Sequence, residues 1–224
     1  MTNGPDGQRR LLALLQLASP GLPVGGFAYS QGLEKAIEDG LVHDAASTQR
    51  WIADLLALSL ARLEAPLWLR AFDAWSIGDT AAFARWNDES IAARETAELR
   101  AESLQMGVSL VRVMPALGVV APTCTPIAFP MAFAAACAAL GIEREAGLAA
   151  YLWAWAENQV LVAVKSVPLG QMAGQTVLAG LHAAIDDATR AALDCTDDAL
   201  GGAAVEFALT SARHEAMYSR LYRS

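Results

Sequence analysis

Prolines and glycines divide this alanine-rich chain into pieces of helical length, and this punctuation constrains the fold more than any other feature of the sequence. Proline interrupts a helix because it lacks a backbone donor, and glycine often closes one. The residues that favour strands never form alternating runs. Apolar side chains instead recur every three or four residues, as at Leu99, Met106 and Leu110. The sequence therefore predicts an all-α fold.

We expect a single-domain helical bundle of about ten helices that spans residues 1–224, with residues 1–8 as a flexible N-terminus. Asp44 is expected to cap the third helix, which would end or kink at Pro66. The expected helices lie at residues 8–18, 30–40, 45–66 and 67–78, in a short piece after residue 79, and at 90–114, 127–140, 143–165, 170–193 and, from either 198 or 203, up to 217.

The composition is unusually apolar for a globular domain. Hydrophobic residues make up 54% of the chain, charged residues only 18%, and the mean hydropathy is +0.31. The uncharged stretches at 113–142 and 166–185 do not resemble membrane spans, because prolines and glycines interrupt them. We therefore expect no membrane association, and instead an apolar surface that partner proteins cover.

Charge and cysteine content narrow the function classes further. The formal net charge of −8 opposes binding to phosphate backbones, so we expect no nucleic acid partner. Cys124, Cys137 and Cys195 show no paired spacing, and the N-terminus lacks the pattern of a signal peptide. These features predict a cytoplasmic location, with Cys124 and Cys137 as buried structural thiols.

Signatures of catalysis and metal binding are mostly missing. The sequence lacks nucleophile-elbow, zinc-protease, paired-cysteine and phosphate-loop motifs. His43, His182 and His214 lie far apart, and none has a second ligand at metal-binding spacing. The glycine-rich run at 23–27 precedes a helix, but no lysine follows it, which favours a tight turn over a nucleotide cradle. We expect no catalytic residue, no metal ligand and no tightly bound cofactor.

Two segments differ from ordinary core or surface. In residues 165–175, Lys165 ends an apolar helix, and Gln171 and Gln175 share a helical face one turn apart. Residues 211–224 form the one basic, aromatic-bearing part of an acidic chain, a composition typical of interfaces. The plain interpretations are a lysine that complements the helix dipole and a frayed chain end.

Four motifs resemble, in order, those of the UreF family of urease accessory proteins, and they cover nearly the whole chain. The first comprises LLQLASP, LPVGGF and YSQGLE within residues 14–34, and the second is LQMG at 104–107. The third runs from ENQ at 157–159 to PLGQ and GQ within 168–175, and the fourth is RHE at 213–215 with YSRL at 218–221. Each motif alone is weak, but four in this order are specific. Tyr222 stands where the family pattern has phenylalanine.

The resemblance implies an all-helical homodimer that is not an enzyme. Such proteins bridge the UreD/UreH accessory protein and the GTPase UreG, regulate that GTPase, and are required for nickel insertion into the apo-urease structural subunits. Nickel would contact the chain only transiently, through the complex. The resemblance places the partner-binding residues in three segments: Pro23, Gly25, Gly26, Phe27, Tyr29, Ser30, Gly32 and Glu34; Lys165, Pro168, Gln171 and Gln175; and Arg213, His214, Glu215, Tyr218, Ser219, Arg220 and Leu221.

The three segments have different expected roles. By resemblance, residues 211–224 become ordered against the UreD/UreH partner, while residues 19–34 and 165–175 form a surface for assembly or GTPase regulation. Two other classes remain open on the residues alone: an enzyme with Lys165 or a cysteine as nucleophile, and a membrane-associated helical protein. A lysine nucleophile needs burial or a neighbouring cation, and the sequence shows no second cation beside Lys165.

Overall fold

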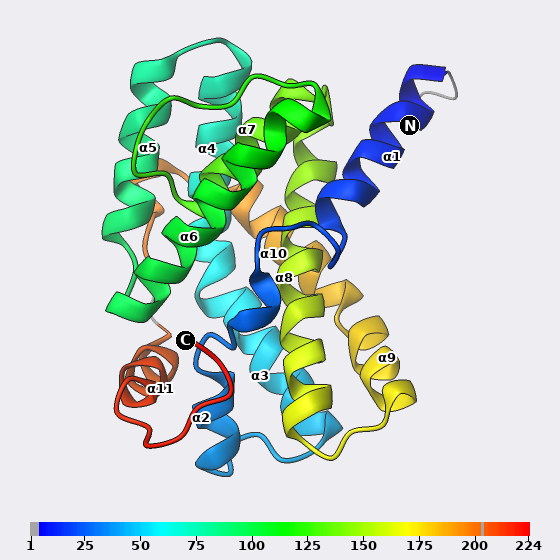
Figure 1. Ribbon diagram of the computed structural model, residues 1–224, viewed down its shortest axis with the longest axis vertical. Coiled ribbons are helices and arrows are strands. Elements are labelled where there is room, and N and C mark those ends of the chain that lie inside the picture. Colours follow the sequence, from blue (N-terminus) through cyan, green and yellow to red (C-terminus); the bar gives the residue numbers. More distant parts are fainter. Residues whose placement is uncertain (1–4, 203) are drawn as a thin grey trace.

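The computed structural model describes residues 5–202 and 204–224, which form a bundle of helices (Figure 1). Most of the connections are short, but a longer loop joins α6 to α7. Within these ranges there is no strand, which confirms the all-α fold. The α-helices are α1 (Pro5–Ala18), α2 (Leu33–Glu38), α3 (Ala45–Leu58), α4 (Glu64–Ser76), α5 (Thr80–Ala92), α6 (Ala97–Val113), α7 (Phe129–Ala139), α8 (Arg144–Ser166), α9 (Gln171–Gly180), α10 (His182–Leu193) and α11 (Val205–His214). Short 3₁₀ helices lie at η1 (Gly26–Ala28), η2 (Leu60–Arg62), η3 (Met114–Leu117) and η4 (Asp197–Ala199).

The alanine-rich helix α7 lies at the centre of the main core. It packs between α4 and α6, and its buried face includes Met131, Phe133 and Cys137. Alanine lets neighbouring backbones approach closely, so α7 contributes packing density rather than bulk. Burial in apolar surroundings raises the pKa of the Cys137 thiol, as expected for a structural cysteine. Cys124 differs from the prediction, because it is only half-buried at the edge of this core.

Several predicted helix boundaries are confirmed by side-chain caps. The Asp44 carboxylate accepts a hydrogen bond from the Ser47 N–H at 2.7 Å, and the Ser47 hydroxyl accepts one from the Asp44 N–H, which completes a capping box before α3. Asp79 caps α5 through the Ala82 N–H at 2.9 Å. Gly141 follows α7 with a positive φ of 66°.

Several predicted helix boundaries inside the chain were wrong. The expected helix at 90–114 is interrupted, because α5 continues to Ala92 and the Thr96 hydroxyl caps α6 through the Leu99 N–H. The break before α4 comes at residues 59–63, and Pro66 lies in the first turn of α4, where no backbone donor is needed. Residues 170–193 form two helices that meet at Leu181.

Both ends of the chain also differ from the predicted boundaries. The helix α1 begins at Pro5, so residues 5–8 of the expected flexible N-terminus are helical, and residues 1–4 lie outside the described residues. Helix α2 starts at Leu33 rather than at residue 30, because Gln31 and Gly32 both have positive φ angles. Helix α11 ends at His214, and residue 203, one of its two expected starts, lies outside the described residues.

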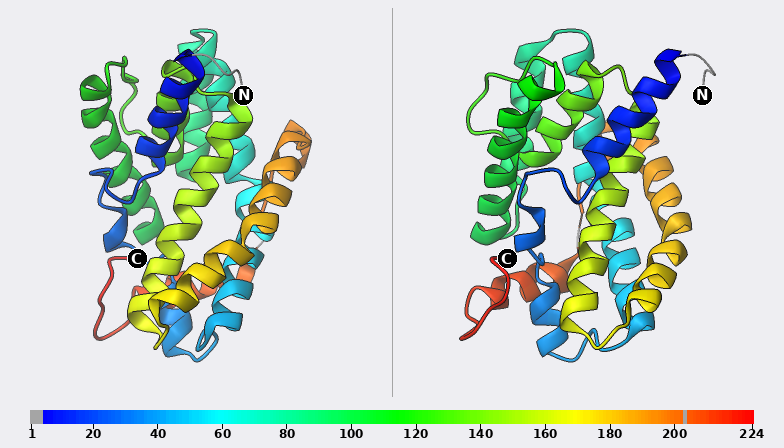
Figure 2. Two further views of the ribbon diagram at one scale, coloured as in Figure 1. Left: turned by 90° about the vertical axis from the view of Figure 1, so that its right-hand side faces the viewer. Right: turned by 45° about the vertical axis from the view of Figure 1, so that its right-hand side comes forward.

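The C-terminal tail, residues 215–224, folds back onto the body of the protein. It leaves α11, turns, and returns to lie beside the start of α2 and the first turns of α6 (Figure 2). Tyr222 is buried in a second, smaller apolar cluster with Leu33 of α2 and with Val162 and Val167 near the end of α8. Segments from the beginning, the late middle and the end of the chain therefore meet in one place.

No helix in the described part of the chain is both long enough and apolar enough to span a membrane. The longest helix, α8, carries charged side chains at both ends and Glu157 in between.

Gly107 provides a test of how closely α6 approaches the segment before α7. A Cβ atom at this position would overlap the backbone carbonyl oxygen of Ile127, which cannot move without shifting α7. We expect Gly107→Ala to lower the free energy of unfolding by about 2–4 kcal/mol, measured by urea denaturation. Val108→Ala, at an exposed neighbouring position, is the control and should change it by less than about 1 kcal/mol.

Candidate functional site

The N-terminal loop, residues 19–34, is held to the helices by its second half. Gly25 has a left-handed backbone with φ 81°, which allows the turn into η1. The buried Tyr29 donates its hydroxyl proton to Gln105 on α6 at 2.7 Å, and its carbonyl accepts from Asn158 on α8 at 3.2 Å. Phe27, by contrast, remains 70% exposed. The loop is thus held in place at Tyr29, while Phe27, two residues earlier, projects into solvent.

The end of the C-terminal tail pairs with this loop through backbone hydrogen bonds. The Arg223 N–H donates to the Ala28 carbonyl at 2.9 Å, and the Ser30 N–H donates to the Ser224 carbonyl at 2.9 Å. The Ser30 hydroxyl donates to the same Ser224 oxygen. Both serines are fully buried, so the tail is packed into the fold rather than frayed.

Glu34, in the first turn of α2, joins the tail to the last turn of α11. Its carboxylate accepts from the Leu221 N–H at 2.7 Å and from the Tyr222 N–H at 3.1 Å. The same carboxylate lies 3.2 Å from His214 Nε2. One buried side chain thereby satisfies two tail donors and faces a histidine ring.

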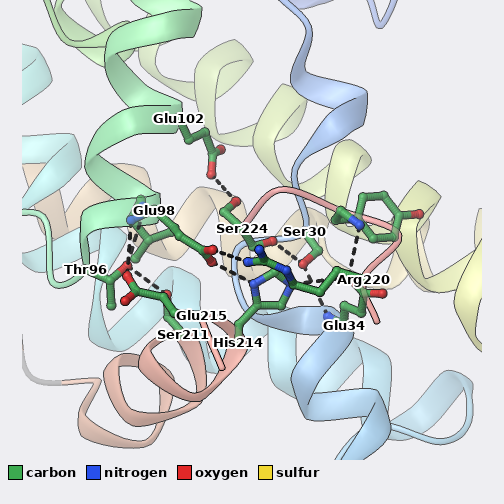
Figure 3. A network of polar contacts seen from close by, with 12 residues as sticks. Ser30, Glu34, Thr96, Glu98, Glu102, Ser211, His214, Glu215, Arg220 and Ser224 are labelled. Atoms are coloured by element: carbon green, nitrogen blue, oxygen red, sulfur yellow. Dashed lines mark hydrogen bonds and ion pairs between the residues drawn. The ribbon is translucent and has the colours of Figure 1, made fainter. Parts of the chain in front are cut away.

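His214 is fully buried between carboxylates from two helices (Figure 3). Its Nδ1 lies 2.7 Å from Glu98 on α6, and its Nε2 faces Glu34 on α2. The two ring nitrogens therefore each face one carboxylate, one from α2 and one from α6. The Glu98 carboxylate also pairs with the Arg220 guanidinium of the tail.

Glu102, one turn beyond Glu98 on α6, receives the last residue of the tail. It accepts from the Ser224 hydroxyl and from Gln31 Nε2, both at 2.6 Å, and Gln31 in turn accepts from Trp155 Nε1 at 2.7 Å. Burial raises the pKa of the Glu102 carboxyl to about 7, although the hydrogen bonds from Gln31 and Ser224 oppose this shift. The group therefore titrates close to neutral pH.

The predicted RHE motif, residues 213–215, and the end of α11 make further polar contacts with α2 and α6. The Glu215 carboxylate accepts from the Glu98 N–H at 3.4 Å, at the start of α6. Arg213 pairs with Asp39 at the end of α2, with 3.4 Å between the charged atoms. Ser211 is buried and lies 3.1 Å from the Thr96 hydroxyl. Helices α2, α6 and α11 are thus linked by polar contacts.

The structure brings together many, but not all, of the residues predicted to bind partners. Those in the polar network, or directly against it, are Tyr29, Ser30, Gly32, Glu34, Arg213, His214, Glu215, Arg220 and Leu221. Pro23, Phe27, Tyr218 and Ser219 have exposed side chains around it, while Gly25 and Gly26 are half-buried. The tail therefore orders against its own chain in this structure, whereas the resemblance implied ordering against a partner.

The third predicted segment contributes surface rather than network contacts. Lys165, Pro168, Gln171 and Gln175 are all exposed around the turn between α8 and α9, and within the described residues Lys165 forms no ion pair. The two glutamines share a solvent-facing side of α9, so their amides need no protein partner. The buried Val167 and the half-buried Leu169 tie this segment to the cluster that contains Tyr222 and Leu33 of α2.

Sequence reasoning missed the residues that receive α11 and the tail, namely Gln31, Thr96, Glu98 and Glu102. It also gave no role to Tyr222 and Ser224, by which the tail itself is anchored. Glu98 and Glu102 are spaced four residues apart and so share a helix face, which is the signal that would have indicated a shared site. In residues 5–202 and 204–224, no group of three or more histidine, cysteine or acidic side chains is arranged to hold a metal ion. Neither does Lys165 lie in the buried setting that a nucleophile requires.

Comparisons with a family model and with known proteins all match this chain to UreF urease accessory proteins. The model of the UreF family matches residues 42–182. The urease accessory protein UreF of Cupriavidus necator is 52% identical over 96% of this chain and 98% of its own length, and that of Azoarcus sp. is 50% identical over 100% and 99%. A bifunctional urease accessory protein UreEF of Bordetella bronchiseptica is 52% identical over 96% of this chain, which matches 52% of that longer protein.

The raised pKa of Glu102 predicts a specific pH dependence of stability. A carboxyl with a folded-state pKa near 7 and an ordinary value of 4.5 stabilises the fold fully below pH 4.5, and loses that contribution as pH rises through 7. Glu102→Gln mimics the protonated form at every pH. We expect the variant to equal the wild type at pH 4 and to be more stable at pH 8 by up to about 3 kcal/mol in urea denaturation. Equal pH dependence of the two proteins would contradict the assignment.

Gly25 and Gly26 are predicted to differ despite being neighbours. Gly25 needs a left-handed backbone, so Gly25→Val should lower the free energy of unfolding by about 2 kcal/mol. Gly26 has an ordinary backbone, and an added Cβ would meet only the flexible end of Met106 at 3.4 Å. We expect Gly26→Val to cost less than half as much, measured by thermal or urea unfolding of both variants in parallel.

Proposed function

The chain belongs to the UreF family of urease accessory proteins, and from this membership we propose that it is a non-enzymatic scaffold for nickel insertion into urease. It is an accessory protein and not an enzyme, as the names of its relatives state. The proposal adds that a cytoplasmic homodimer bridges UreD/UreH and the GTPase UreG, regulates GTP hydrolysis, and presents the assembly to the apo-urease subunits. Nickel would pass through this complex without a resident site in the chain.

The observation that supports a scaffold most directly is the composite surface made by the N-terminal loop and the C-terminal tail. Buried hydrogen bonds fix the backbone of both segments. Three large side chains nevertheless project into solvent: Tyr218 is fully exposed, Leu221 is 79% exposed and Phe27 is 70% exposed. Large apolar side chains on a pre-organised backbone are characteristic of protein interfaces, because little entropy is lost when a partner covers them.

Two further observations fit a role in a multi-protein assembly. One relative is named as a bifunctional UreEF, in which the matching region is joined to another accessory function in a single polypeptide. The turn between α8 and α9 offers a second exposed surface, where Met172 is 81% exposed close to Lys165 and Gln171. Two separate exposed surfaces on one small protein fit a bridging subunit.

The tail surface can be tested without disturbing the fold. Tyr218→Ala and Leu221→Asp change side chains that project into solvent, while the Leu221 N–H still reaches Glu34. We expect each variant to melt like the wild type but to bind the UreD/UreH protein of the same organism at least about tenfold more weakly. The measurement is titration by biolayer interferometry, together with co-elution on a sizing column with light scattering.

Ile77→Asp is the matched control, because Ile77 is equally exposed but lies at the end of α4, away from the tail. Normal UreD/UreH binding by both tail variants would show that this surface is not the partner site. A wild-type chain that remains monomeric and binds neither UreD/UreH nor UreG would contradict the scaffold function itself.

A further inference from the structure

A cleft lies beside the composite surface, between the N-terminal loop, α6, α7 and α8. Its walls are mainly apolar and come from segments far apart in the sequence: Leu22, Val24, Met106, Phe133 and Leu161. Phe27 also lines it and is 70% exposed, and Leu161 is 36% exposed, so the cleft is open to solvent on this side.

The charged side chains of the cleft are predominantly acidic. Glu64, Glu102 and Glu157 line it, and Arg94 is the one basic side chain among the lining residues. Arg94 is already paired with Glu64, which also accepts the Tyr151 hydroxyl at 2.5 Å. With its single cation already paired, the cleft presents a negative potential to any occupant.

Glu157 differs from the other two carboxylates. Glu102 is satisfied by Gln31 and Ser224, whereas Glu157 has no hydrogen-bond or ion-pair partner within the described residues. It is half-buried on α8, and burial raises the pKa of its carboxyl. A partly desolvated carboxylate without a counter-charge is costly unless something supplies that charge.

The size of the cleft limits what can enter it. It holds about 110 Å³ of space accessible to water. An apolar cavity of about 150 Å³ binds one benzene molecule, so this space suits one side chain rather than a drug-sized ligand. Lysine and arginine have an apolar stem and a charged head, and they commonly bury the stem while the head meets a carboxylate.

We propose that the cleft receives one lysine or arginine side chain from a partner protein of the urease-maturation assembly. The stem would pack against Phe27, Met106 and Leu161, and the charged head would pair with Glu157. This assignment rests on the proposed scaffold function, and it adds the chemistry of the contact: an apolar partner segment that carries a single cation.

The test compares charge variants of two glutamates on the same helix. Glu157→Gln and Glu157→Lys alter the cleft, while Glu145→Lys makes the same charge change at an exposed position of α8 outside it. The affinity of each purified chain for the UreD/UreH and UreG proteins of the same organism is measured by calorimetry. We expect Glu157→Gln to weaken the binding of one of these two partners about tenfold, and Glu157→Lys to weaken it more than about hundredfold. Glu145→Lys should weaken the binding of either partner less than about twofold.

Thermal unfolding of the same variants separates a binding role from a structural one. Since Glu157 has no partner in the part of the chain that the structure describes, Glu157→Gln should be at least as stable as the wild type. A clear loss of stability would mean that the carboxylate serves the fold, and would overturn the proposal.

Three further outcomes of the binding and light-scattering measurements separate the cleft assignment from the scaffold function. Variants of Glu157 that bind both partners as Glu145→Lys does would overturn the cleft assignment while leaving the scaffold function intact. Variants that lose self-association in light scattering, but still bind both partners, would identify a second copy of the chain as the occupant and also overturn it. A wild-type chain that binds neither partner would instead remove the proposed function on which the inference rests.

Discussion

The Glu34 carboxylate is the group on which the arrangement of the chain's two distant segments depends. A buried carboxylate is unfavourable unless hydrogen bonds replace those it made to water. The tail supplies the Leu221 and Tyr222 N–H groups, and α11 supplies His214. Helix α2, at six residues, is too short to be stable in isolation. The helix and the tail therefore stabilise each other, and loss of either would leave unpaired polar groups in the other.

Two kinds of interaction hold different parts of the molecule. The main core around α4 and α7 is apolar, with side chains such as Trp68 and Phe133 fully buried, and its stability depends on area and packing. The tail is held by carboxylates, serines and one histidine, and Tyr222 alone adds a large apolar anchor. Changes of pH and ionic strength should therefore act on the surface formed by the N-terminal loop and the tail before they act on the bundle.

The sequence predicts most of this fold because many helix ends are determined by a capping or turn residue and its immediate neighbours. Asp44, Asp79 and Gly141 mark boundaries that depend only on neighbouring residues, and these were predicted correctly. The breaks at Thr96 and Leu181 were missed because nearby residues continue an acceptable helical pattern, and tertiary packing decides where the chain turns. The site was predictable only in its motif residues. The pairing of Glu34 and Glu98 with His214 joins positions more than 100 residues apart, and no local pattern encodes such a contact.

The contact between Ser30 and Ser224 closes a loop of 194 residues. Closing so long a loop has an entropic cost that is repaid only when the intervening segments are already compact. The helical core consequently has to form first, and the tail docks onto a finished bundle. The surface formed by loop and tail thus exists only on chains that have completed folding, and its presence would itself distinguish a mature subunit from an unfinished one.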